Sequence, residues 1–152
     1  MKRVLNIAVF ISFILAMCFG TGMSGAVQQT AATEDELTKS AVEEAMANIE
    51  YAYASRNILT MMDTLDKNFE GWLSFKSSVQ NEFLSVKEQQ IHFVIDTFLT
   101  EADKVSVRHH WFKKTIDNSG SFSKSEGQSE FVFNNTPGGL KLLYIRGDNP
   151  FF

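Results

Sequence analysis

The chain of 152 residues has little cysteine and little histidine. Because Cys18 is the only cysteine, the chain cannot form an intrachain disulfide or a zinc site built from cysteine pairs. The three histidines are His92, His109 and His110, and none of them forms an HxH or HxxxH pattern. Because zinc sites need several ligands with such spacings, we expect no metal site and no cofactor.

Basic side chains are also scarce, with 14 lysines and arginines against 18 acidic residues. Two of the basic residues, Lys2 and Arg3, belong to a short basic N-terminal stretch; without them the formal charge is −6. An acidic surface repels nucleic acid and anionic membranes, so we expect neither as a partner. Phenylalanine is abundant, with 14 residues, which is typical of a packed core or a pocket wall.

No apolar run is long enough to span a membrane, which takes roughly 20 residues. The run Val4–Met17 instead has the length of a signal-peptide core, and the small residues at 24–26 suit cleavage. We therefore expect a signal peptide over residues 1–26, no membrane span after its removal, and a periplasmic or secreted chain. The alternative is a lipid anchor on Cys18, although Met17 stands where a lipobox usually has a small residue.

Helical patterns fill the first half of the remaining chain. After a flexible lead-in over residues 27–36, apolar residues at helical spacing predict a helix that ends near Arg56, with Thr33 and Glu36 as a capping box. Asn57 caps a short second helix. A third helix carries Phe83 and ends between residues 87 and 90.

The apolar period then changes from about 3.6 to 2, which predicts strands. We expect strands over residues 91–99, 105–111, 131–133 and 140–145. A tight turn at 101–103, a mobile serine-rich loop at 118–126 and a turn at 134–139 join them. Helices followed by an antiparallel meander describe an α+β fold in one domain.

This order resembles the nuclear transport factor 2-like superfamily, which includes SnoaL-type cyclases and ketosteroid isomerase. The resemblance is carried by "YAYASRNI" before "MMDTLDKNF", by "IHFVIDTFLTEADKVSVRHHWF" and by "GLKLLYIRGDNPF". It implies that residues 37–152 form a cone, with N-terminal helices packed on a curved, mainly antiparallel sheet around a ligand pocket. The last strand lacks the tryptophan of the family's Gly-x-Trp-x-Ile pattern, so the resemblance leaves the subfamily open.

The adjacent histidines cannot bind one metal from a regular strand, because successive side chains point to opposite faces. The apolar neighbours Val107 and Trp111 place His109 on the inner face and His110 on the outer face. If Asp96 also points inward, Asp96 and His109 form an acid–base couple of the kind that the resemblance implies. The alternative is a core histidine bonded to a hydroxyl such as that of Tyr144.

Three functions remain open at this point. The first is binding of a small apolar ligand or a protein partner, without catalysis. The second is a cofactor-free isomerase, dehydratase or cyclase that uses Asp96 and His109, and the third is a homodimer formed through the outer face of the sheet. Tyr51 or Tyr53 could offer a ligand its hydroxyl, although a tyrosine packed with its tip in water is the simpler interpretation. The predicted pocket is lined by Phe83, Phe93, Val107, Trp111, Phe133 and Tyr144.

Overall fold

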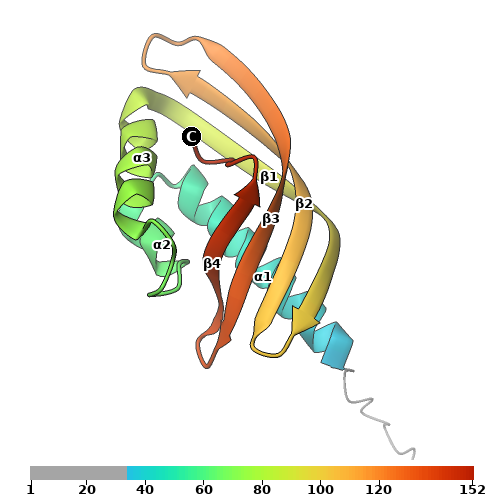
Figure 1. Cartoon of the computed structure of the whole chain (residues 1–152). Coiled ribbons are helices and arrows are strands. Elements are labelled where there is room, and N and C mark those ends of the chain that lie inside the picture. The colour runs from blue at the N-terminus through green and yellow to red at the C-terminus, as the bar shows by residue number, and fades with distance from the viewer. Residues whose placement is uncertain (1–33) are drawn as a thin grey trace, which may run out of the picture. The chain divides into compact units, whose positions relative to one another are not determined.

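The computed structural model describes residues 34–152, which cluster as one compact unit. The predicted signal peptide, Cys18 and most of the predicted lead-in lie outside the described residues. Three helices precede four strands (Figure 1). In chain order the elements are α1 (Glu34–Ala54), α2 (Ile58–Asp63), α3 (Trp72–Ser85), β1 (Val86–Glu101), β2 (Lys104–Asp117), β3 (Phe122–Thr136) and β4 (Gly139–Gly147).

The three predicted helices are confirmed, with shifted boundaries. α1 begins at Glu34, so the last residues of the predicted lead-in are helical. The predicted cap of α2 is present, since the Asn57 side chain accepts hydrogen bonds from the backbone N–H groups of Leu59 and Thr60. α3 ends at Ser85 and the chain passes directly into β1, five residues before the predicted strand start. None of these helices is long and apolar enough to cross a membrane.

The four strands form one antiparallel sheet in the order β1-β2-β3-β4, as the predicted meander requires. The strands extend beyond the segments in which apolar and polar residues alternate, because backbone pairing continues where the side chains become polar. The predicted loop at 118–126 was therefore too long: residues from Phe122 onward belong to β3 and pair with β2 as far as Ile116. Likewise, Asn134 and Asn135 belong to β3 rather than to the final turn.

Side chains alternate between two faces of this sheet. The inner face is apolar and packs with the helices, whereas the outer face is mostly polar. Buried inner-face residues join the helical residues in one core cluster. The inner face includes Phe93, Val107, His109, Trp111, Phe131 and Phe133, and the outer face includes His92, Val94, His110, Phe112, Lys114 and Lys124.

The segment after β4 turns inward and lies between α3 and the sheet (Figure 1). Phe151 is fully buried there, and its ring centroid lies 5.6 Å from that of Tyr53, 5.5 Å from that of Phe75 and 5.9 Å from that of Phe131. Such ring packing adds to the burial of apolar area. The interior between helices and sheet therefore contains a phenylalanine supplied by the chain itself.

Candidate functional site

His109 is the only histidine in the core of the described chain, as the alternation predicts. It is 1 % exposed, and its ring centroid lies 4.9 Å from that of Phe93 and 4.3 Å from that of Phe131. Its Nδ1–H donates to the carbonyl of Val107 at 3.3 Å, and its Nε2 has no partner within residues 34–152. Burial in this aromatic surrounding lowers the pKa of His109 from 6.5 to about 4, so the ring is neutral at pH 7. The predicted alternative, a bond to the Tyr144 hydroxyl, is not the one formed.

Asp96 is paired with the other histidine. A β-bulge between Ile95 and Thr97 shifts the register of β1 against β2 at this point. The Asp96 carboxylate accepts a bond from Nδ1–H of His110 at 2.8 Å, and Nε2 of His110 accepts one from the Gln128 amide at 2.8 Å. The side chains of Asp96 and His110 are 42 % and 44 % exposed. This pair lies on the outer face.

Asp96 and His109 nevertheless border the same shallow hollow of about 550 Å³. The hydrogen bond to Val107 and, to a smaller extent, the Asp96 carboxylate partly offset the effect of burial on the pKa of His109. The structure shows no hydrogen bond between the two side chains, because Asp96 is engaged by His110. A catalytic role for Asp96 and His109 therefore stays a prediction.

Five of the six predicted pocket residues, Phe83, Phe93, Val107, Trp111 and Phe133, are buried in the core cluster. They pack against one another and against the rings of Phe131 and Phe151. Tyr144 does not join them: its hydroxyl accepts a bond from Arg146, whose guanidinium stacks on the ring at 4.9 Å. The inner-face position predicted for Tyr144 was wrong, because the bulge between Val132 and Phe133 changes the pairing of β3 with β4.

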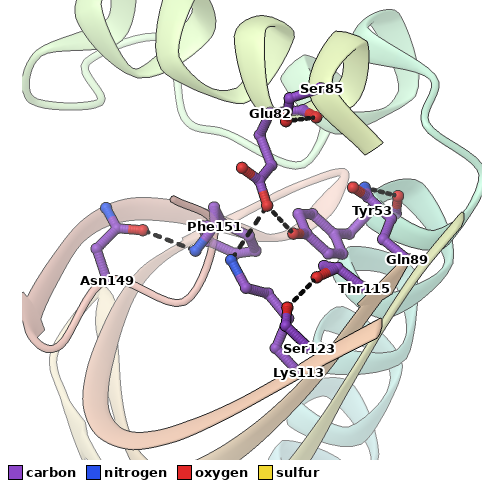
Figure 2. A network of polar contacts seen from close by, with 9 residues as sticks. All are labelled: Tyr53, Glu82, Ser85, Gln89, Lys113, Thr115, Ser123, Asn149 and Phe151. Carbon is purple, nitrogen blue, oxygen red and sulfur yellow. Dashed lines mark hydrogen bonds and ion pairs between the residues drawn. The ribbon is translucent and has the colours of Figure 1, made fainter. Parts of the chain in front are cut away.

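A polar network lies beside Phe151 (Figure 2). Glu82 of α3 accepts a bond from the Tyr53 hydroxyl at 3.4 Å and forms an ion pair with Lys113 at 3.3 Å. Burial first, and the Glu82 charge second, raise the pKa of Tyr53 far above its usual range, so the hydroxyl keeps its proton. The sequence interpretation missed Glu82 and Lys113; the available signal was that Lys113 continues the inner-face alternation two residues after Trp111.

A large opening lies outside this core. It is a groove of about 980 Å³ between α1 and the strands β1, β2 and β3, lined mainly by outer-face residues of the strands, hereafter the α1 groove. No single segment carries it, which is why the sequence interpretation did not find it. Its lining consists of Ala47, Glu50, Tyr51, Ala54, Gln90, Ile91, His92, Phe112, Lys113, Lys114, Lys124, Ser125 and Glu126.

The α1 wall of this groove is fastened to the free edge of β1. The Glu50 carboxylate accepts the backbone N–H of Phe93 at 2.6 Å and lies 3.1 Å from Nδ1 of His92. One turn further along α1, the carbonyl of Tyr53 accepts a bond from the buried Gln89 amide at 2.6 Å. The first bond satisfies a backbone N–H at the edge of the sheet, and both bonds hold the helix beside the strand. These contacts set the position of the α1 wall relative to β1.

Neither the groove nor the core presents a metal centre, since residues 34–152 contain no cluster of three or more histidine and acidic ligands. The buried carboxylate of Asp66 has a structural partner instead. It accepts bonds from the Asn134 amide at 2.9 Å and from the Asn68 backbone N–H at 2.8 Å, and the first of these contributes most to lowering its pKa. Asp66 thus ties the loop after α2 to β3.

The sequence matches no protein-family model and none of the curated proteins with which it was compared. Solved structures do match. A nuclear transport factor 2-like superfamily protein of Salmonella enterica is 11% identical, with a TM-score of 0.64 over 76% of this chain and 93% of that chain. A "Putative Scytalone Dehydratase" of Novosphingobium aromaticivorans is 13% identical, with a TM-score of 0.65 over 76% of this chain and 87% of that chain.

A third structure, a "putative dehydratase from the NTF2-like family" of Streptomyces avermitilis, is 14% identical, with a TM-score of 0.64 over 76% of this chain and 97% of that chain. Sequence identities this low support a shared backbone fold but not a shared chemistry. The helices packed on a curved, open four-stranded antiparallel sheet agree with these structures. The chain has the nuclear transport factor 2-like fold.

Proposed function

We propose that this chain is an exported, non-catalytic binding protein that holds a small amphipathic molecule in the α1 groove. The observation that carries the proposal is the contrast between the packed interior and the open groove of about 980 Å³. That volume lies within the roughly 300–1,000 Å³ typical of small-molecule sites. Export rests on the N-terminal sequence pattern described above.

The lining of the groove suits a ligand with an apolar and a polar part. Tyr51 and Phe112 are exposed aromatic side chains, and Ala47 and Ala54 leave room on the helical wall. Exposed rings of this kind provide contact area at little cost in conformational entropy. Polar groups from three strands surround them.

The test uses a neutral probe, naphthalene-2-carboxamide, and a variant that fills the groove. Ala47 is exposed on α1, so Ala47→Trp obstructs the groove without disturbing the core. Ser40→Trp is the matched control, because Ser40 is exposed on the same side of α1 two turns earlier and does not line the groove. We expect chemical-shift changes at groove amides in the wild type and in Ser40→Trp, and at least a tenfold weaker affinity in Ala47→Trp, on the order of one buried aromatic contact.

Binding that is unchanged in Ala47→Trp would place the probe elsewhere and refute the proposed site. The same conclusion follows if the shifts map to the interior beside Phe151. Native mass spectrometry of protein purified from its host complements this test, since a retained small molecule identifies the natural ligand. Absence of both a retained mass and any response to amphipathic probes would refute a binding function.

A second candidate is the cofactor-free isomerase, dehydratase or cyclase that uses Asp96 and His109. It is supported by the hollow that both residues border, and by a fold shared with proteins named as dehydratases. A base at His109 needs Asp96 released from His110, so His110→Gln should raise any turnover. Turnover that is unaffected by both Asp96→Asn and His109→Gln would eliminate this candidate.

A further inference from the structure

Two lysines face each other directly across the floor of the α1 groove. Lys114 of β2 and Lys124 of β3 are paired in the strand register, and both line the groove. Directly opposed side chains in an antiparallel sheet have Cβ atoms about 5 Å apart, and like charges there are destabilising. In a chain with an acidic excess, this arrangement of two cations calls for a compensating anion.

The acidic residues around the groove form no ion pair with these lysines: Glu126 lies in the next cross-strand row and is in none of the ion pairs within residues 34–152. Lys113 already pairs with Glu82, and Glu50 is occupied by the Phe93 N–H and by His92. Within residues 34–152, neither Lys114 nor Lys124 takes part in an ion pair; the Lys124 ammonium lies 5.5 Å from the centre of the Phe122 ring. Among the described residues, the adjacent pair therefore has no counter-charge within ion-pair distance.

The apolar part of the groove lies one step along the same face. Gln90, Lys114 and Lys124 form one cross-strand row, and His92, Phe112 and Glu126 form the next row on that face. Two residues along a strand span about 6.6 Å. A flat aromatic molecule of that length contacts Phe112 with its ring and reaches the lysine row with a substituent.

We propose that Lys114 and Lys124 recognise the anionic group of the ligand, and that the ligand is an amphipathic aromatic carboxylate. This inference rests on the proposed function of the α1 groove. Two ammonium groups from neighbouring strands donate to the two oxygens of one carboxylate, and such charge-assisted bonds are stronger than neutral ones. Glu126, in the row beside the lysines, restricts the site to a ligand with a single negative charge and disfavours polyanions.

The experiment compares naphthalene-2-carboxylate with its neutral isostere, naphthalene-2-carboxamide, by calorimetric titration at pH 7. We expect the wild type to bind the carboxylate roughly tenfold more tightly, as partly exposed charge-assisted bonds provide. In Lys114→Gln/Lys124→Gln this preference should disappear, while the affinity for the carboxamide stays within about twofold. Added salt should weaken binding of the carboxylate only.

The matched control is Lys39→Gln/Lys104→Gln, which removes the same net charge from exposed positions outside the groove. It should keep the tenfold preference. An equal loss of preference in the control, or equal binding of both probes to the wild type, overturns the lysine pair as the recognition element. If the carboxamide binds and Ala47→Trp abolishes its binding, the proposed function stands even when the anion inference falls.

The thermal midpoint of the free protein provides an independent check of folding. Because the opposed lysines repel each other, Lys114→Gln/Lys124→Gln should leave Tm unchanged or raise it slightly. A lower Tm that accompanies the lost preference would mean that the lysines support the sheet itself, and that outcome also contradicts the proposal. The probe titrations, their salt dependence and the thermal midpoint together distinguish a binding role of the two lysines from a structural one.

Discussion

The inner and outer faces of the sheet are built from alternate residues of the same strands, and they have opposite properties. The inner face buries aromatic rings against α1, α3 and the segment after β4. The outer face carries exposed histidines, opposed lysines and the floor of the α1 groove. In this chain the inner face supports stability, and the recognition chemistry that we propose lies on the outer face.

Two consecutive residues of β2 show this division most clearly. His109 is buried, with the rings of Phe93 and Phe131 beside its own, and this burial lowers its pKa to about 4. His110 lies half-exposed between Asp96 and Gln128, with both ring nitrogens hydrogen-bonded. The pleat of the strand alone separates their environments.

The largest change in the free energy of unfolding is expected from the loss of a buried ring on the inner side of the sheet. Phe151 is fully buried and packs against the rings of Tyr53, Phe75 and Phe131. Phe151→Ala should lower the free energy of unfolding by about 3–5 kcal/mol, because truncating a buried phenylalanine loses its burial and leaves a cavity. Urea unfolding at pH 7 measures the change.

The neighbouring Phe152 provides the control, since it is 52 % exposed and its ring contacts only that of Phe75 among the described residues. Phe152→Ala should lower the free energy of unfolding by less than about 1 kcal/mol. Similar small losses for both variants would show that the segment after β4 does not fill the interior. The inner side of the sheet would then not be closed by the chain, and the difference that we draw between the two faces would be wrong.

A smaller effect is expected from the titration of His109. The pKa of its imidazole is about 4 in the folded chain and 6.5 when unconstrained, so the unfolded state binds the proton first as the pH falls. The resulting contribution to stability is complete above about pH 6.5 and is lost progressively toward pH 4. At about 1.36 kcal/mol per pH unit, the wild type should lose about 2–3 kcal/mol between pH 7 and pH 4.5 through this group.

Denaturant unfolding of His109→Phe at both pH values isolates this contribution from that of the carboxylates. The variant should lose about 2–3 kcal/mol less than the wild type over the same interval. The control is His110→Gln, which changes the exposed neighbour and should keep the steep pH dependence of the wild type. Identical pH dependence in His109→Phe and the wild type would mean that the inner histidine titrates like an exposed one.

The order of helices and strands was predictable because apolar periodicity reports burial directly. The inward position of His109 followed from the same alternation. The ends of the strands were not predictable, because the polar residues of β1 and β3 continue the backbone ladder without an apolar signal. No sequence pattern indicates where a bulge occurs, which is why Tyr144 was assigned to the wrong face.

The site was less predictable than the fold. Asp96 was expected beside His109 from its place in the hairpin, yet the pairing with His110 depends on side-chain rotamers and on the bulge after Ile95. The α1 groove combines residues from one helix and three strands. Such a surface depends on how α1 docks against the edge of β1, through Glu50 and Gln89, and no local pattern encodes that docking.

The smallest effect is expected from the outer pair of Asp96 and His110. Both side chains are more than 40 % exposed, so water and salt screen their 2.8 Å contact. A double-mutant cycle with Asp96→Ala and His110→Ala should give a coupling free energy below about 1 kcal/mol at pH 7, and less in 1 M salt. A coupling above about 2 kcal/mol would show that the outer face also holds its polar groups rigidly. The hollow that Asp96 shares with His109 would then be a preorganised site, which would favour the catalytic candidate over the binding one.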